Sequence, residues 1–372
     1  MKGNIVCGLM TVGALLAFAG AVSATSITVP LSSFVIFSGG GVQVQGGFET
    51  SIGGHTFITG NIGSNQDLFM QGNPEAFFPA LLMGGAYAGG NLTFGQDLTV
   101  GSGSALQQVV VNGTATINGG VTINGTLNAF IASVNGTASV TGGTTTGAGA
   151  NTFALITMPT ATVITAGSTP IAANGQTLAQ GSYGNLTATQ NKTITLTSGT
   201  YNFSSINTSG GFTLQIDLSS GNPIYIYVAG DMSFGQNNTL LVKGAGTGGA
   251  FVPLNQAQSL ASLIYMETNA NFSMGGNNQS GVPHPQNIWG GTLYASDINL
   301  LDADSNANGD IGINQYMNWT GAAYAFDTFD VADHGTWTLV PFTRVPEPAS
   351  LLLLGAGLVG LACYGRKRLW KK

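Results

Sequence analysis

The stretch that decides the fold is VVVNGT-ATINGG-VTINGT, residues 109–126, in which one short pattern occurs three times in six-residue steps. Each step holds a strand of two or three residues with alternating apolar positions and closes on Asn-Gly. Asn and Gly tolerate left-handed backbone angles, so the chain turns at these positions at little cost. Each step therefore predicts a very short strand followed by a turn.

Related steps surround this stretch, and the second half of the chain continues the pattern with longer strands. LTFGQD and LTVGSG precede it at residues 92–103, and steps at Val134 and Val140 follow in a shifted phase. Alternating strands are expected at 192–196, 200–203, 212–218, 223–228 and 239–242. Only 74–87 and 256–266 offer short helical patterns.

Two arrangements compete for these strands: hairpins with Asn-Gly turns, or a solenoid whose strands stack in parallel. Strands of two or three residues pair weakly in a hairpin, whereas successive coils repeat the pairing about every 4.8 Å. Stacking also aligns Val and Ile inside the coil and Asn and Thr at its corners. The sequence therefore predicts an all-β, elongated parallel β-helix (solenoid).

Composition excludes several classes of protein. The 372 residues include 57 Gly, and only 6% are charged, against about 25% in an ordinary soluble domain. With 43% apolar residues, the chain can nevertheless build a core. A coiled coil and a charged disordered chain are both excluded. Residues 25–348 hold three basic residues and all fifteen acidic ones, a net charge of −12. Because nucleic-acid binding needs cations against the phosphates, it is excluded.

Both terminal segments of the chain are predicted to be targeting signals. Residues 1–24 are predicted to be a signal peptide, with Lys2, an apolar stretch and a small-residue cleavage site at Val22-Ser23-Ala24. Residues 25–344 form the predicted solenoid body, and 345–372 the sorting and anchor segment. The only cysteines, Cys7 and Cys363, lie in these terminal segments.

The C-terminal segment has three parts in a fixed order. Val345, Pro346, Glu347 and Pro348 precede sixteen uncharged residues at 349–364, and the basic residues Arg366, Lys367 and Arg368 follow. The uncharged part predicts a C-terminal transmembrane helix of about 24 Å, with its basic end cytoplasmic.

This three-part order closely resembles the PEP-CTERM sorting signal of Gram-negative bacteria, over about 28 residues. The resemblance implies an exosortase-type transpeptidase as partner, with cleavage near the Pro-Glu-Pro motif, and an association with exopolysaccharide. Leu369-Trp370 interrupts the basic cluster, which departs slightly from the family's pattern.

The body resembles, more loosely, the ice-binding-like β-solenoid family in segments such as FVIFSG at 34–39, SGTYNF at 198–203 and GGTLYAS at 290–296. The resemblance implies a right-handed β-helix accompanied by one short helix. Because that family also includes adhesins, the fold alone does not fix an activity.

One loop has the ligand spacing of a calcium site. Asp304, Asn306, Asn308 and Asp310 follow an EF-hand-like order, but position 12 is Gln315 instead of a bidentate acid. An Asx-rich turn is the favoured interpretation, and any calcium affinity is expected to be weak. No other cofactor is predicted.

No constellation predicts catalysis. Acid pairs occur at Asp302/Asp304 and Asp327/Asp330, but close pairs are common in loops. His55, His284 and His334 lack metal-ligand spacing. Thr-x-Thr pairs, such as Thr193/Thr195/Thr197, are the residues an ice-binding face would use, yet Thr is simply a good strand former. Trp289 and Trp319 are expected in the core in preference to stacking on sugars.

Together, these patterns predict an exported, non-enzymatic protein with a structural or adhesive role in the cell envelope or exopolysaccharide matrix. An ice-binding protein is the alternative, and a polysaccharide-degrading enzyme is a less favoured one.

Overall fold

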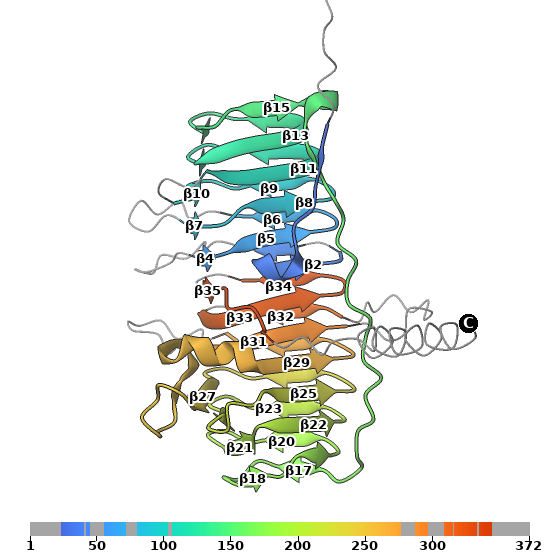
Figure 1. Ribbon diagram of the computed structural model, residues 1–372, viewed down its shortest axis with the longest axis vertical. Helices are drawn as coiled ribbons and strands as arrows, with labels where there is room; N and C mark the ends of the chain where they lie inside the picture. Colours follow the sequence, from blue (N-terminus) through green and yellow to red (C-terminus); the bar gives the residue numbers. More distant parts are fainter. Residues whose placement is uncertain are drawn as a thin grey trace, which may run out of the picture.

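The computed structural model describes residues 24–40, 42–44, 56–71, 80–102, 106–276, 287–296, 309–314, 316–332 and 335–343. Within these ranges the chain is an elongated stack of short strands (Figure 1). All the described strands except β1 (Ser26–Ile27) and β16 (Thr152–Phe153) join one sheet of 33 strands. The pairing is parallel throughout, apart from the short β28 (Val252–Pro253) on β27 (Thr239–Lys243). The predicted parallel solenoid is confirmed.

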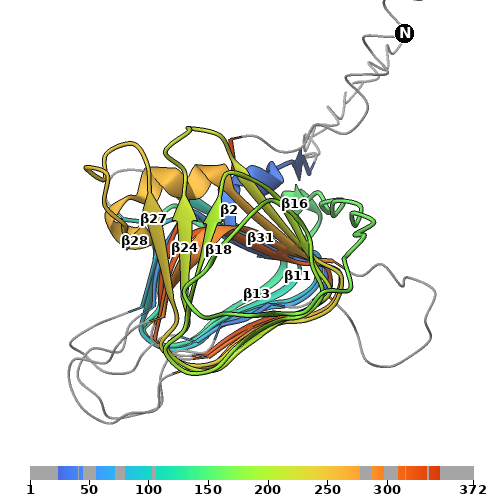
Figure 2. The same ribbon diagram turned by 90° about the horizontal axis from the view of Figure 1, so that it is seen from below.

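The coils are three-sided in cross-section (Figure 2), and each side of the stack is a ladder of parallel strands. We name the sides face A, face B and face C, in the order in which a coil passes through them. Face A holds β4 (Phe57–Thr59), β7 (Ala80–Leu82), β10 (Leu98–Val100), β12 (Thr122–Ile123), β14 (Ser139–Val140), β18 (Thr177–Leu178), β21 (Thr193–Thr197), β24 (Thr213–Asp217), β27 and β35 (Gly335–Thr338).

Face B is the side that the chain reaches next. It holds β2 (Phe34–Ser38), β5 (Asn61–Ser64), β8 (Ala86–Ala88), β15 (Thr144–Thr146), β19 (Gly181–Ser182), β22 (Gly199–Phe203), β25 (Ile224–Val228) and β29 (Ile264–Thr268). Face C holds β3 (Val42–Val44), β6 (Leu68–Met70), β9 (Leu92–Phe94), β17 (Ile171–Ala172), β20 (Leu186–Ala188), β23 (Ile206–Thr208), β26 (Met232–Phe234), β30 (Phe272–Met274), β32 (Ile311–Ile313) and β34 (Phe329–Val331).

Four longer strands turn a corner. β11 (Gln107–Ile117) and β13 (Gly125–Val134) run from face B to face C, and β31 (Asn287–Ala295) and β33 (Met317–Ala325) from face A to face B. The β31–β33 pairing is continuous at the corner, whereas the β11–β13 register shifts between Val111 and Thr114. At the bend of β33, Gly321 has a φ of 141°, and a Cβ there would lie 2.1 Å from the Gly291 carbonyl oxygen. Only glycine fits where two coils approach this closely.

The six-residue step of the sequence is one side of a coil. Val109 begins on face B, Ala115 lies on face C, and Val121 leads into face A before Leu127 returns directly above Val109. Eighteen residues thus complete this turn, so the three quoted steps build one full coil. The inward residues of the steps, such as Val109, Ile117 and Ile123, are fully buried.

Side chains at the corner between faces B and C link the coils. The Asp231 carboxylate accepts the N–H of Asn271 (3.2 Å), whose side chain accepts the N–H of Asp310 (3.1 Å). Asp310 in turn accepts the N–H of Thr328 at 3.0 Å. Asp67, Asn91 and Thr114 repeat the arrangement higher in the stack. At this corner, Asp and Asn side-chain oxygens therefore cap N–H groups of the next coil.

The coils are not stacked in the order of the sequence, which the sequence did not predict. The chain enters the middle of the stack at β2, climbs to β15 at one end, and crosses back to the opposite end at β17. From there it climbs again until β33, β34 and β35 pair with β2, β3 and β4. The first and last coils of the described chain therefore meet at one junction within the stack.

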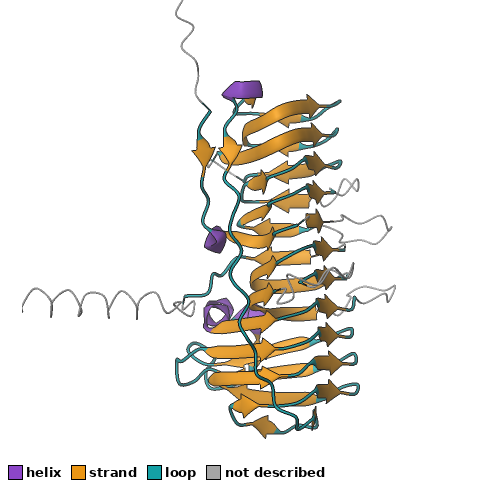
Figure 3. Cartoon of the chain, turned by 90° about the vertical axis from the view of Figure 1, so that its right-hand side faces the viewer, coloured by secondary structure: helices purple, strands orange, loops and turns teal. Residues whose placement is uncertain are grey.

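Residues 154–170 make the return crossing, and we call them the strap. The strap runs along the outside of face B (Figure 3). Asn65 holds it through two hydrogen bonds with Ile156, at 2.7 and 2.8 Å. Near the lower coils, Glu267 accepts the Thr162 N–H at 2.6 Å and its hydroxyl at 2.8 Å. Phe34, Phe37, Tyr87 and Phe153 fill a second apolar cluster beneath this outer layer.

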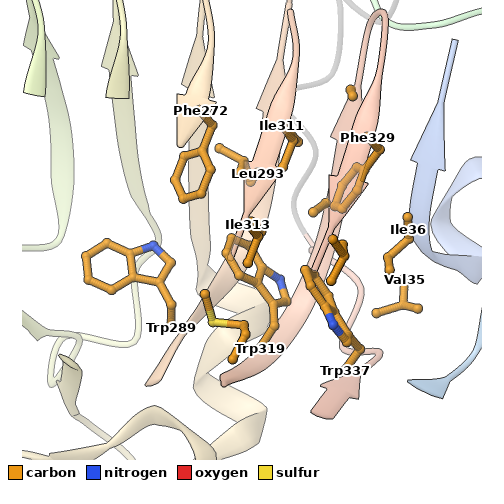
Figure 4. Packing of buried hydrophobic residues seen from close by; sticks show 14 of the residues in the cluster. Val35, Ile36, Phe272, Trp289, Leu293, Ile311, Ile313, Trp319, Phe329 and Trp337 are labelled. Carbon is orange, nitrogen blue, oxygen red and sulfur yellow. The ribbon is translucent and has the colours of Figure 1, made fainter. Parts of the chain in front are cut away.

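Three tryptophans on successive strands lead up to the junction (Figure 4). Trp289, Trp319 and Trp337 are in register and fully buried, and the Trp319 and Trp337 rings stack at 5.4 Å. Trp337 is aligned with Ile58 of β4, so the apolar interior continues from one part of the chain into the other. The expectation that Trp289 and Trp319 belong to the core is confirmed.

Helical structure is sparse. The described helices are all of the 3-10 type: η1 (Leu31–Ser33), η2 (Gly147–Gly149), η3 (Leu254–Gln256) and η4 (Gln258–Leu263). The pattern at 256–266 gives η4 before the chain enters β29. The helix predicted at 74–87 was wrong for the described residues of that range, because Ala80–Leu82 and Ala86–Ala88 are strands. Residues 74–79 lie outside the described ranges.

Candidate functional site: a polar groove between faces A and B

A groove of about 650 Å³, open to solvent, lies at the corner between faces A and B in the lower coils. Successive coils supply its lining at the same corner. The lining residues are Gln180, Thr197, Ser198, Gly199, Thr200, Asp217, Ser220, Asn222, Pro223 and Tyr225. Asp217 is the single charged residue in this lining.

Stacking places these residues beside one another. The register aligns Thr197 with Asp217 and Thr200 with Tyr225, so each pair lies on adjacent strands. The Ser198 hydroxyl donates to the Asn222 carbonyl oxygen at 2.8 Å. The Ser220 hydroxyl donates to the Ser198 hydroxyl at 2.9 Å. Residues twenty or more positions apart thus form one wall.

Asp217 carries the charge of the groove. Its carboxylate accepts the backbone N–H of Ser219 at 3.0 Å and the ammonium of Lys243 at 2.9 Å. Hydrogen bonding from the Ser219 side chain, and then from Lys243, lowers the pKa of Asp217 to about 2. The carboxylate therefore stays ionised at all ordinary pH values and serves as a hydrogen-bond acceptor.

Tyr225 supplies the aromatic part of the groove and belongs to a larger tyrosine cluster on face B. Its ring stacks on Tyr227 with centroids 6.3 Å apart and an interplanar angle of 3°. Tyr265 and Phe342 lie 6.3 and 5.9 Å from it. Burial raises the pKa of Tyr227 to about 12, so the neighbouring hydroxyl stays neutral. The Tyr225 ring is therefore held in one orientation by its neighbours.

The lining has the chemistry of a site for a neutral polar ligand. Amides of Gln180 and Asn222 and several hydroxyl groups supply donors and acceptors, and one aromatic ring supplies an apolar surface. The described lining contains a single carboxylate, so it lacks the pair of acids that glycoside hydrolysis normally requires.

The predicted calcium loop is only partly described. Asp304, Asn306, Asn308 and Gln315 lie outside the described residues. Asp310 caps Thr328 at the corner between faces B and C, accepting its N–H and hydroxyl at 3.0 and 2.5 Å. Among the described residues, no three His, Cys, Asp or Glu side chains are grouped to hold a metal ion. Calcium binding here stays a prediction.

The other candidate residues are not brought together. Asp330 is exposed on face C, and the Asp327 carbonyl oxygen accepts the N–H of Gly40 (2.7 Å) at the junction. Asp302 and the three histidines lie outside the described ranges. Thr193, Thr195 and Thr197 project from one strand. Thr193 is aligned with Thr213 and Thr239, but the column of Thr177 and Thr195 continues with Gln215 and Leu241, and Thr197 is aligned with Asp217. The described part of face A therefore has no uniform threonine array.

Sequence reasoning missed the groove. The alternation in Pro223-Ile-Tyr-Ile-Tyr was a usable signal, because it places Tyr225 and Tyr227 on the outer side of a strand. Nothing in the sequence, however, shows which residues of the preceding coils lie beside Tyr225, because coil length varies. Residues 186 and 206 are aligned, and so are 206 and 232.

The predicted sorting motif, Val345 to Pro348, and the basic residues Arg366 to Lys372 lie outside the described residues, as does the predicted membrane helix. A search of the described ranges finds no helix with the length and apolarity to span a bilayer.

Comparisons with known proteins give a match for this C-terminal segment and one solved structure. That structure is the crystal structure of an ice binding protein from an Antarctic bacterium, Flavobacteriaceae. It has 12% sequence identity and a TM-score of 0.27, and the alignment covers 85% of this chain and 98% of that one. No curated protein matches the chain. Residues 344–368 match the family described as the PEP-CTERM protein-sorting motif. The chain therefore carries a PEP-CTERM sorting signal, which marks it as an exported protein that an exosortase processes and that is anchored at the cell envelope through its C-terminal end.

Proposed function

We propose that this protein is a non-enzymatic adhesive component of the cell envelope that binds neutral polysaccharide through the groove between faces A and B. The observation that carries the proposal is the lining of the groove: amides and hydroxyls around one tyrosine ring, with one carboxylate that is already paired with Lys243. Sugars offer hydroxyl groups to such partners and C–H faces to an aromatic ring. The exopolysaccharide of the cell is the expected source of the ligand.

The absence of cations from the groove narrows the class of ligand. The described lining contains no basic residue, and the nearby Lys243 is already paired with Asp217. An acidic polysaccharide would therefore find no free cation to meet its carboxylates, which disfavours binding. We therefore expect neutral glycans to bind and uronic-acid polymers to bind much more weakly.

The test is isothermal titration of the full chain in detergent with a panel of neutral and acidic oligosaccharides. Tyr225→Ala removes the stacking surface and is expected to weaken binding of the best neutral ligand at least tenfold, as loss of a central aromatic anchor usually does. Tyr183→Ala is the matched control: it removes a tyrosine ring that stacks on Phe203, with centroids 5.6 Å apart, and that does not line the groove. Equal losses in both variants, or no binding by the parent chain, would refute the proposal.

The same titration separates binding from turnover. Chromatography of each glycan after long incubation is expected to show no cleavage, because the described lining holds one carboxylate only. Ice binding is tested by thermal hysteresis, for which we expect no activity, since of the three columns through Thr193, Thr195 and Thr197 only the first keeps threonine on the next two strands.

A further inference from the structure

The chain contains six Asn-Gly pairs, and five of them lie among the described residues. These five begin at Asn112, Asn118, Asn124, Asn135 and Asn174. In such a pair the glycine nitrogen can attack the side-chain amide of the asparagine without an enzyme, because glycine has no side chain to obstruct the approach. The reaction requires an amide that is free to turn and a glycine N–H that is not already donated. The surroundings of each pair therefore decide whether it reacts.

Three of the pairs have their amides fixed by neighbouring backbone. Both polar atoms of the Asn112 amide bond to the backbone of Phe153, at 2.9 and 2.7 Å. The amides of Asn118 and Asn124 each donate to a carbonyl oxygen of the preceding coil at 3.0 Å. Because these bonds must break before the amide carbon can turn towards the following glycine, the fold opposes the reaction at all three positions.

The fourth pair is protected through its glycine. Asn174 is exposed near the other end of the stack, and its side chain makes no hydrogen bond with a described residue. The Gly175 N–H, however, donates to the Thr193 carbonyl oxygen at 2.7 Å. The nitrogen that would have to attack the amide is therefore already engaged.

The fifth pair lies in the turn between β13 and β14, where Asn135 is one coil above Asn118. No described strand pairs above this turn, and Asn135 and Gly136 are both exposed. The Asn135 amide nitrogen lies 3.4 Å from the Asn118 Oδ1, and the Asn135 Oδ1 accepts the Ser133 hydroxyl at 3.0 Å. No described acceptor is bonded to the Gly136 N–H. Asn135 therefore combines a weakly held amide with an available nucleophile.

We propose that Asn135 is a site of spontaneous deamidation at the end of the stack. The Gly136 nitrogen attacks Cγ of Asn135, so that an N–Cγ bond forms as the Cγ–Nδ2 bond breaks. The amide nitrogen takes up the proton that Gly136 loses and leaves as ammonia. Water then opens the five-membered imide at either carbonyl, which gives aspartate or isoaspartate. The net reaction consumes one water and releases one ammonia, with no change of oxidation state.

The modification changes the chemistry of the end coil. Residues 98–191 contain no Asp, Glu, Lys or Arg, so deamidation introduces a negative charge into an uncharged region. The new carboxylate removes the donor that faced Asn118 and sets two acceptors against each other. The Asn135 carbonyl oxygen also accepts the Ala138 N–H at 3.1 Å, a bond that isoaspartate displaces by one methylene. We therefore expect the last turn to loosen while the coils below it keep their pairing.

The test follows the full chain in detergent at mildly alkaline pH, which favours loss of the glycine proton. Samples taken over time are digested with chymotrypsin and measured by mass spectrometry. Cleavage after Phe130 and Phe153 releases residues 131–153, in which Asn135 begins the only Asn-Gly pair. Conversion is expected to be about tenfold or more faster at Asn135 than at the other four pairs. Equal conversion at Asn118 or Asn174 would overturn the proposal.

The sequence itself supplies the matched control. Residues 111–114 and 134–137 both read VNGT, so Asn112 and Asn135 have the same neighbours in the chain and different surroundings in the fold. In concentrated urea the two are expected to react at the same rate, and a preference for Asn135 that persists there would contradict a structural cause. Asn135→Gln is expected to abolish the mass change in residues 131–153, because its longer side chain closes the ring far more slowly.

The loosening of the end coil is tested separately. Asn135→Asp reproduces one product of the reaction and is expected to speed hydrogen exchange at the Ala138 amide several-fold. Asn174→Asp adds the same charge near the other end of the stack and is expected to leave Ala138 unchanged. Equal exchange at Ala138 in the parent chain and in Asn135→Asp would show that the turn does not loosen. None of these measurements depends on glycan binding by the groove.

Discussion

At the corner of the groove, the ionisation of Asp217 depends on two neighbours that are brought to it in different ways. Ser219 is two residues further along the same turn, whereas Lys243 comes from the next coil. In the unfolded chain the pKa of Asp217 returns towards 3.8, and in the folded chain it is about 2. These bonds therefore stabilise the fold above about pH 4, and their contribution is lost as the pH falls towards 2.

We predict that Ser219→Ala raises the pKa of Asp217 more than Lys243→Ala does, because the bond from Ser219 is the larger cause of the lowered value. The pKa is measured from the pH dependence of the Asp217 carboxyl carbon in NMR spectra. Asp330 on face C is the internal control: desolvation raises its pKa, and that pKa is expected to be the same in both variants. A larger effect of Lys243→Ala would show that the ion pair dominates.

At the scale of the element, the strap is held mainly by polar contacts with face B. Its lower part has exposed apolar residues, such as Val163 at 80% exposure, so little apolar burial holds it there. Glu267, which is 1% exposed, supplies the strongest contact and also accepts the Tyr265 hydroxyl at 3.0 Å. A buried carboxylate is tolerated at this position because three donors surround it.

We predict that Glu267→Gln lowers the free energy of unfolding by about 2 kcal/mol. An uncharged amide oxygen accepts hydrogen bonds less strongly than a carboxylate, and the amide NH₂ group would face donors of Thr162 or Tyr265 with which it cannot pair. Thermal unfolding measures the loss, and hydrogen exchange is expected to be faster at the Thr162 amide. Val163→Thr changes an exposed neighbour in the strap and serves as the control. Unchanged exchange at Thr162 in Glu267→Gln would contradict this role.

At the scale of the whole molecule, the junction places the first coil, which begins at β2, against the last coil, which ends at β35. Each of these coils therefore has a neighbouring coil on both sides. In a solenoid, coils with neighbours on both sides are more stable than terminal ones. A solenoid stacked in chain order would leave β2 and β35 at its two ends. Here both lie inside the stack, and β15 and β18 belong to the end coils instead.

We therefore predict that amides of residues 34–38 and 317–325 exchange at least a hundredfold more slowly than those of 144–146 and 177–178. Hydrogen exchange with mass spectrometry measures the peptides in one experiment. Residues 213–217, which lie inside the stack by either arrangement, provide the reference for full protection. Fast exchange at 34–38 would mean that the junction does not hold in solution.

Much of the architecture follows from local patterns. The steps at residues 109–126 predicted parallel stacking, but the expected separate strands of the first two steps were wrong, because both steps lie in one strand, β11. The alternation at 192–242 predicted β21, β22, β24, β25 and β27 within one or two residues of their ends. Val345 to Pro348, with the basic residues beyond them, identified the sorting signal, which the family match confirms. These predictions succeed because turns, side-chain alternation in strands and a contiguous sorting signal each depend on residues that are close together in the sequence.

The order of the coils, the strap and the groove were decided by tertiary structure alone. The strands of one face are chemically similar, so several of them could pair with β2. The local sequence therefore does not show that β2 pairs with β33 inside the stack instead of lying in a terminal coil. Coil lengths between 15 and 49 residues further prevent the sequence from showing that Thr200 lies beside Tyr225. The sequence by itself determined the strands, the turns and the sorting signal, because each of these depends on residues that are neighbours in the sequence. Only packing over the whole chain selected which coils meet, because that choice depends on the apolar area and hydrogen bonds that the complete stack buries.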